Sequence, residues 1–217
     1  MHSLRNLVAS NSKKPMACAL AALLAAGCAS VERTAERPVV SLLELRHENV
    51  VVQKWDLSCG AAALATLLTY QHGDPVSEKA IAEAMLRSTN PLRVKVRGGF
   101  SLLDLKRFVE TRGLAGAGYS NLSLEQLIDL GPAIVPVDLS GYSHFVVFRA
   151  RIGNRVLLAD PAYGNRSLDA ETFEKAWLRH IAFVVTRPDG TPPPNRLGPH
   201  TADLLFASQR SIEVALR

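Results

Sequence analysis

The chain has 217 residues, of which 47% are hydrophobic and 21% are charged. These values are typical of one globular domain with extensions, and they exclude a disordered or collagen-like chain. The formal net charge is +5, but removing the basic leader residues Arg5, Lys13 and Lys14 leaves only +2. Such a balance gives no electrostatic footprint for a phosphate backbone, so nucleic acid is excluded as a partner.

Residues 1–28 have the layout of a signal peptide, with basic residues, an apolar run from Met16 to Ala26, and small residues around Cys28. The run is too short for a membrane-spanning helix, which needs about 20 residues. The segment from Leu24 to Cys28 resembles the bacterial lipobox, which implies lipidation of Cys28 and a membrane anchor. The alternative is ordinary cleavage near Ser30. Both interpretations predict a periplasmic protein, and Ala29 after a lipidated cysteine favours the outer membrane over the inner one.

Residues 29–49 are polar and are expected to form a tether, followed by a first strand at residues 49–54. After Cys59, the run from Gly60 to Tyr70 is rich in helix formers and apolar on all sides. This pattern predicts a central, buried helix that begins at the cysteine. The folded domain is expected to cover residues 50–187.

Three further helices are indicated by serine residues in N-cap positions. These serines are Ser77, Ser101 and Ser123. The first helix is predicted to turn Ile81, Met85 and Leu86 inwards, the second to end at Arg112 and the third at Leu130. Between the first two, residues 87–98 are predicted to be a solvated basic loop.

From Pro132 the pattern changes to short β-rich runs, which predict antiparallel strands at residues 133–137, 145–148 and 156–159. A short helix at residues 169–177 and a last strand at 181–186 follow. Helices first and sheet afterwards is the α+β arrangement. Residues 188–217 contain three consecutive prolines and are expected to be a linker and a C-terminal tail, in which residues 202–216 could form a helix.

Three polar residues lie where these elements begin or end. Cys59 opens the buried helix, where unpaired backbone N–H groups and the helix dipole are expected to lower the pKa of the thiol. His144 opens the second predicted strand, and Asp160 follows the third. A general base and its orienting carboxylate are held in this way on adjacent strands. The alternative interpretation is a core cysteine and the exposed end of a strand.

The strand pairing gives a geometric condition for this site. A plain two-residue turn at Gly153-Asn154 would place Asp160 opposite Val147, on the face of the sheet away from His144. For the two side chains to meet, the connection must have odd length, contain a β-bulge, or leave Asp160 beyond the end of the strand. We predict one of these three arrangements.

Taken together, the motifs resemble the pattern of the papain-like C39 peptidases over about residues 50–185. The residues that carry the resemblance are Gln53 before Cys59-Gly60, then Gly99-Phe100-Ser101, Gly113-Leu114, Gly131-Pro132, His144-Phe145, Asp160-Pro161, Phe173 and Trp177. The chain is similar in particular to standalone C39 peptidases found with functional-amyloid export systems.

The resemblance implies a papain-like fold and a cysteine endopeptidase without metal or cofactor. In such an enzyme Cys59 attacks the carbonyl carbon, His144 transfers the proton, Asp160 orients the imidazole, and Gln53 donates to the oxyanion. The implied cleavage follows a Gly-Gly pair in a leader or export substrate, such as an amyloid or bacteriocin-like precursor. Trp55, close to the cysteine, is a candidate for lining the substrate groove.

Two alternatives use the same residues differently. A catalytically silent C39-like module would bind an export substrate or secretion partner, and a transferase or amidase would act on a non-peptide amide. The remaining histidines of the body are interpreted as solvated or structural. They are His47, His72, His180 and His200.

Overall fold

The computed structural model of the protein describes residues 40–139, 141–200 and 203. The predicted leader, with Cys28, lies outside these residues, as does nearly all of the helix expected at 202–216. Among the described residues, no helix has the length and apolar character needed to cross a membrane.

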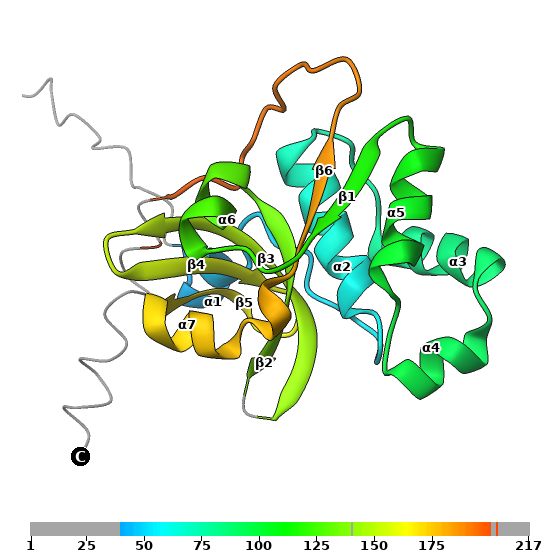
Figure 1. Ribbon diagram of the computed structural model, residues 1–217, viewed down its shortest axis with the longest axis horizontal. Coiled ribbons are helices and arrows are strands. Elements are labelled where there is room, and N and C mark those ends of the chain that lie inside the picture. The colour runs from blue at the N-terminus through cyan, green and yellow to red at the C-terminus, as the bar shows by residue number, and fades with distance from the viewer. Residues whose placement is uncertain (1–39, 140, 201–202, 204–217) are drawn as a thin grey trace, which may run out of the picture. The chain divides into compact units, whose positions relative to one another are not determined.

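Antiparallel strands form one twisted sheet in the order β1-β6-β2-β3-β4-β5 (Figure 1). Their bounds are β1 Ala115–Tyr119, β2 Ala133–Leu139, β3 Tyr142–Ile152, β4 Arg155–Asp160, β5 Gly164–Asp169 and β6 Ala182–Thr186. The strands predicted from the runs after Pro132 are thus confirmed as β2, β3, β4 and β6.

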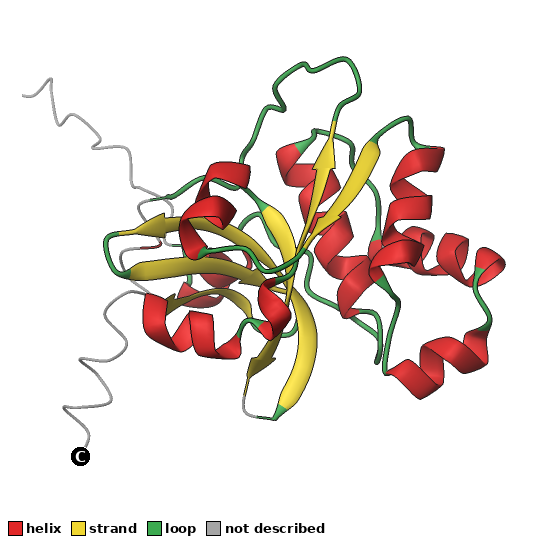
Figure 2. Ribbon diagram, in the orientation of Figure 1, coloured by secondary structure: helices red, strands yellow, loops and turns green. Residues whose placement is uncertain are grey.

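Helices lie on both sides of this sheet, and Figure 2 shows α2 to α5 gathered at one side of the molecule. The helices are α1 Leu42–His47, α2 Cys59–Thr66, α3 Glu78–Ser88, α4 Pro91–Arg97, α5 Leu102–Thr111, α6 Leu124–Leu130 and α7 Ala170–Ala176. A π-helical turn, Leu67–Gln71, continues α2, and a 3₁₀ turn, Leu178–His180, follows α7. The predicted α+β class is confirmed.

Two apolar clusters form the core, one on each face of the sheet. The first joins α2, α3 and α5 to Val147 and Ala159, and the second joins α6 and α7 to Val146 and Leu158. Every residue of α2 is buried, as the apolar sequence predicted. The helix is therefore a fixed central element, and Cys59 is its first residue.

The predicted serine caps are confirmed, since Ser77, Ser101 and Ser123 each accept a hydrogen bond from the backbone N–H three residues later. Each bond satisfies one of the N–H groups that a helix start leaves unpaired. Ile81 and Met85 are buried as expected. Leu86 is 41% exposed, so its assignment to the inner face was wrong.

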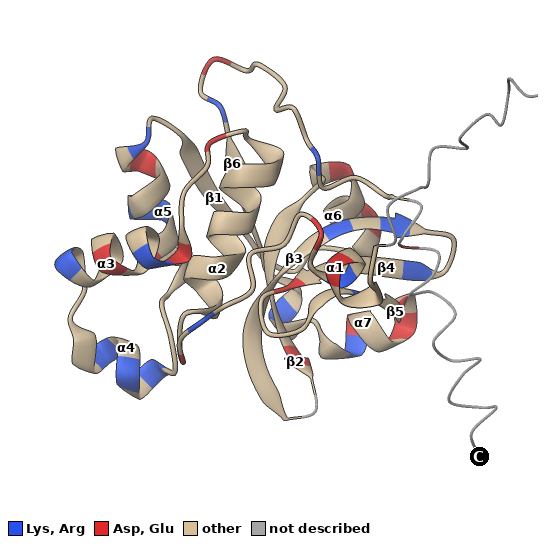
Figure 3. Ribbon diagram, turned by 180° about the vertical axis from the view of Figure 1, so that it is seen from behind, with Lys and Arg blue, Asp and Glu red and all other residues tan. Residues whose placement is uncertain are grey.

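The structure differs from the sequence prediction before and after α3. Residues 49–54 form no strand, and the preceding segment contains α1, which begins with a capping box of Ser41 and Glu44. Residues 91–97 form α4 rather than a loop, because Pro91 occupies the first turn and the Asn90 side chain caps it. The basic residues of α4, blue in Figure 3, are nevertheless exposed, as predicted.

The segment after β6 is not a free linker where it is described. It arches away from β6 and returns to the body (Figure 1). The backbone N–H groups of Asn195 and Arg196 donate to the carbonyls of Gln71 and Tyr70, and Leu197 is fully buried. The sequence prediction was wrong here because proline content indicates an extended chain but not what that chain contacts.

Candidate active site

Cys59 and His144 line the same cleft, which has a volume of about 310 Å³. The cysteine reaches it as the first residue of α2, and the histidine reaches it from the start of β3. The two side chains are almost fully buried, with 4% of Cys59 and 7% of His144 exposed. The structure thus brings together the cysteine and the histidine that the sequence singled out.

His144 is paired with Asp160 on the neighbouring strand. Its Nε2 lies 3.6 Å from Asp160 Oδ2, and both side chains are buried. Asp160 also accepts from the Ala162 backbone N–H at 2.9 Å and from the Arg166 guanidinium at 3.2 Å. The carboxylate is therefore fixed by one hydrogen bond from Arg166 on β5 and one from the loop that follows β4. The contact between His144 and Asp160 can shorten when a substrate binds, because catalytic hydrogen bonds are often long in the absence of substrate.

A β-bulge makes this pairing possible, which confirms one of the three predicted arrangements. Ile152 pairs with Arg155 across the two-residue turn, but the β3–β4 register shifts between Phe148 and Ala150. The shift leaves Arg149 as the extra residue, so that Val147 pairs with Ala159 instead of Asp160. Asp160 consequently lies on the same face of the sheet as His144.

The pKa of the Cys59 thiol shifts in the direction opposite to the sequence prediction. Burial raises the pKa of the Cys59 thiol, although the backbone N–H groups of Phe145 and Gly60 oppose this. Burial also lowers the pKa of His144, with Asp160 opposing the change and Arg166 adding to it. A helix terminus contributes roughly 0.3–1 kcal/mol, which is less than one pKa unit, so desolvation dominates. The expected depressed thiol pKa was therefore wrong for the resting site.

We expect this resting state to show in the pH dependence of alkylation. With a neutral thiol beside a neutral imidazole, the rate of Cys59 modification by iodoacetamide should stay low at pH 7. It should rise only when the pH is above the ordinary cysteine pKa of about 8.5, because burial raises the pKa of this thiol. Mass spectrometry of the Cys59 peptide measures the rate. Rapid alkylation at pH 6 that is lost in His144→Ala would instead establish a thiolate–imidazolium pair.

The segment before the nucleophile is fixed by Glu78, a buried residue at the start of α3 that the sequence analysis did not identify. Its two carboxylate oxygens each accept from the Lys54 backbone N–H at 3.1 Å, and Oε1 lies 2.5 Å from the Ser58 hydroxyl. Glu78 is 3% exposed. The one sequence signal for Glu78 was its position in the first turn of a predicted helix. A glutamate in that position is usually exposed to solvent, so the position did not indicate a buried role.

Replacing Glu78 by glutamine is expected to lower kcat by about 10²-fold, because the amide nitrogen cannot accept a hydrogen bond and the segment carrying Cys59 shifts. Steady-state cleavage of a peptide that the unmodified chain cleaves measures the loss. Glu110→Gln, at an exposed ion pair with Lys106, is the matched control and should leave kcat unchanged. An equal loss in both variants would contradict the positioning role.

The other two predicted site residues, Gln53 and Trp55, are not among the residues that line the cleft. The Gln53 backbone N–H donates to the carbonyl of Pro161, the residue after Asp160, at 2.8 Å. Its Oε1 is buried without a hydrogen-bond partner, and its Nε2 is 3.4 Å from the Trp55 carbonyl. Trp55 is 47% exposed and lines an adjacent pocket, which shares Phe100 with the cleft.

The remaining histidines do not line this cleft. His180 stacks on Trp177 and contacts the Leu122 carbonyl, His72 is buried, and His200 contacts the Arg196 carbonyl. Among the described residues, no three His, Cys, Asp or Glu side chains are grouped so as to hold a metal ion.

Comparison with known proteins identifies a family for the chain. A sequence model described as the Peptidase C39 family matches residues 47–189. Two curated relatives named "Probable functional amyloid protease FapD" are 42% identical, from Pseudomonas aeruginosa, and 37% identical, from Pseudomonas fluorescens. Each alignment covers 69% of this chain and 65% of the relative.

A solved structure supports the same fold. The peptidase domain of Streptococcus ComA, described as a bi-functional ABC transporter involved in a quorum sensing pathway, superposes with a TM-score of 0.53 at 22% identity. The match covers 65% of this chain and 99% of that domain, and at this identity it concerns the fold alone. The chain belongs to the Peptidase C39 family.

Proposed function

We propose that the protein is a cysteine endopeptidase that acts on an exported protein or peptide. The observation that carries this proposal is the bulged pairing of β3 and β4, which brings Asp160 to His144 in the cleft that Cys59 also lines. A core cysteine and an unrelated strand end would not require this register.

In the proposed mechanism the neutral imidazole of His144 removes the proton from Cys59 as the sulfur attacks the carbonyl carbon. The protonated imidazole then gives that proton to the leaving amine, which leaves an acyl-enzyme for water to hydrolyse. Asp160 faces Nε2 and stabilises the imidazolium, so that Nδ1 is the atom that takes the proton. The Gln53 side-chain amide and the Cys59 backbone N–H would donate to the oxyanion.

Cleavage after a Gly-Gly pair fits the shape of the cleft. Its wall between α4 and α5 includes Gly98 and Gly99, so the backbone itself lines the space. A Cβ atom at Gly99 would lie 3.3 Å from the Leu57 carbonyl oxygen, and the glycine has a φ of +150°. A narrow cleft with a backbone wall favours small residues beside the scissile bond.

Trp55 is proposed to contact the substrate outside the cleft. It lines a pocket of about 470 Å³ together with the apolar residues Leu57, Leu86, Val94 and Phe100. This pocket suits apolar side chains of a leader peptide, and burial of one such side chain is worth roughly 1.5–3 kcal/mol. We expect Trp55→Ala to raise KM about tenfold with kcat nearly unchanged. A fall in kcat at constant KM would contradict this role.

The substrate and the site of action are proposed from the leader and from the names of the relatives. The two FapD proteins are described as functional amyloid proteases, which supports an exported amyloid precursor as substrate. The lipobox-like segment supports lipidation at Cys28, with the domain anchored in the periplasm, at the outer membrane. Mass spectrometry of the N-terminal peptide from membranes tests this, since an unmodified Cys28 would exclude the anchor.

Incubating the chain with matched leader peptides tests the proposed activity. One peptide carries Gly-Gly at the expected cleavage point, and the other carries Val-Val in its place. Cleavage of the Gly-Gly peptide, without cleavage of the Val-Val peptide, supports the proposed endopeptidase. Binding of the leader without cleavage would favour the silent module, while transfer of the acyl group to an added amine with little hydrolysis would favour the transferase.

A further inference from the structure

Arg149, the extra residue of the β3 bulge, carries a buried guanidinium whose hydrogen bonds are all satisfied. It is 3% exposed, and it donates to Asn165, Asp203 and the carbonyls of Leu197 and Gly198. Both guanidinium NH₂ nitrogens contact the Asp203 carboxylate, at 2.8 and 3.1 Å. Five donors therefore meet five acceptors, which is the full capacity of an arginine.

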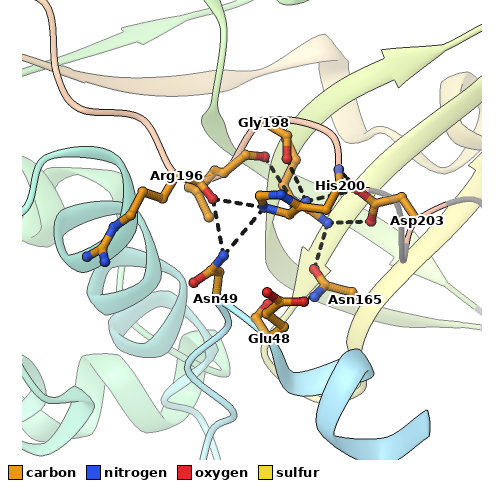
Figure 4. Close-up of polar contacts among 9 residues, drawn as sticks. Glu48, Asn49, Asn165, Arg196, Gly198, His200 and Asp203 are labelled. Atoms are coloured by element: carbon orange, nitrogen blue, oxygen red, sulfur yellow. Dashed lines mark hydrogen bonds and ion pairs between the residues drawn. The ribbon is translucent and has the colours of Figure 1, made fainter. Parts of the chain in front are cut away.

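Most of these acceptors belong to residues 195–200 and 203, which we call the C-terminal strap. The strap and its neighbour Asn165 also form hydrogen bonds with Glu48 and Asn49, in the segment that precedes the nucleophile (Figure 4). Asn165 on β5 accepts from Arg149 and donates to the Glu48 carbonyl at 2.7 Å. Asn49 donates to the Arg196 carbonyl at 3.3 Å. The bulge is thus locked by contacts from both ends of the described chain.

The strap also contacts the helix that carries the nucleophile. Its residues 195 and 196 donate to the last carbonyls of the π-helical turn that continues α2, and Leu197 packs into the first core cluster. One short segment therefore holds the far end of the Cys59 helix and the bulge of the His144 strand. The strap lies beyond residues 47–189, the part that matches the family.

A bulge leaves one residue unpaired in the ladder, so its position needs a compensating interaction. A buried guanidinium without its carboxylate is a strongly unfavourable arrangement. Sliding β4 by one residue would restore regular pairing, and it would also turn Asp160 to the opposite face of the sheet.

We propose that Arg149 and Asp203 form a positioning pair for the active site: they hold the extra residue out of the β3–β4 ladder, and thereby fix the register that presents Asp160 to His144. Neither residue contacts the reacting atoms. The effect on the strand register is independent of the proposed activity, whereas its catalytic consequence rests on that activity.

The test uses the full chain with isotope-labelled histidine, and NMR titration of His144, assigned with His144→Gln. Because Asp160 raises the pKa of His144, Asp203→Asn and Arg149→Met should lower it further, to the value in Asp160→Ala. Asp203→Glu should restore it. The control Asp74→Asn, next to His72, should change the His72 titration only. An unchanged His144 titration in folded Asp203→Asn would overturn the proposal, even if that variant melts earlier.

A second measurement separates positioning from general stability. Asp203→Asn should lower kcat by about 10²-fold in the unmodified chain, with KM retained. It should cause no further loss in an Asp160→Ala background, because the interaction that it protects is already absent. Equal losses in both backgrounds would overturn the positioning role. If the unmodified chain cleaves no peptide, the proposed activity fails, and the His144 titration still decides the register.

Discussion

Replacing Cys59 by alanine is expected to abolish peptide cleavage, with a loss of about 10⁶-fold in kcat, the scale seen when a protease loses its nucleophile. Cys59 is the one cysteine among the described residues, and His144 has no other thiol to activate there. Alanine fits the buried start of α2, where Gly60 and then Ala61, Ala62 and Ala63 follow. Mass spectrometry of the cleaved leader peptide gives the rate.

Substrate binding serves as the control for this variant. Cys59→Ala should retain the affinity of the unmodified chain for the leader peptide, because the pocket at Trp55 does not include residue 59. A variant that binds without cleaving assigns the loss to the chemical step. Cleavage within tenfold of the unmodified rate would rule out Cys59 as the nucleophile.

Replacing Asp160 by alanine is expected to lower kcat by about 10⁴-fold with little change in KM, because removing the carboxylate of a catalytic triad has an effect of this size. Without the carboxylate, nothing fixes the imidazole tautomer or stabilises its protonated form. The partly buried contact with Arg166 is lost at the same time. Steady-state kinetics on the Gly-Gly peptide, together with thermal unfolding, measure the two consequences.

Asparagine at this position makes the comparison sharper. Both Asp160 oxygens accept hydrogen bonds, one from the Ala162 N–H and the other from Arg166, with His144 beside it. An asparagine can keep an oxygen toward His144 only by turning its NH₂ group to the Ala162 N–H, which also donates. This conflict should keep Asp160→Asn below the activity of the unmodified chain. The variant should still retain more activity than Asp160→Ala, because its oxygen can accept a hydrogen bond from His144. Equal activities would indicate that orientation of His144 contributes little.

Local sequence signals predicted the elements that carry the site. The serine caps identified α3, α5 and α6, and the apolar run after Cys59 identified α2. Because a cap and a periodic pattern act within a few residues, they remain valid whatever the rest of the chain does. The helix-first order of these signals was also sufficient for the fold class.

Elements with weak local signals were missed. Strand β1 has the sequence AGAGY and β5 has GNRSLD, neither of which contains the β-branched run that marks a strand. Both are strands because a neighbour supplies the ladder: β6 pairs with β1, and β4 pairs with β5. Gly164 opens β5 against α1, where a Cβ atom would lie 2.6 Å from the Arg46 carbonyl oxygen.

By itself the sequence determined the family and the order of the main elements, and it singled out Cys59, His144 and Asp160, which the structure brings together. It also required an irregular β3–β4 pairing, since the alternation of side chains is a property of any strand. Tertiary structure alone decided which irregularity occurs, and it placed Arg149 in the bulge with acceptors up to 54 residues away. It also decided that the pKa of Cys59 is raised, because desolvation depends on packing from the whole fold rather than on the helix that the cysteine begins.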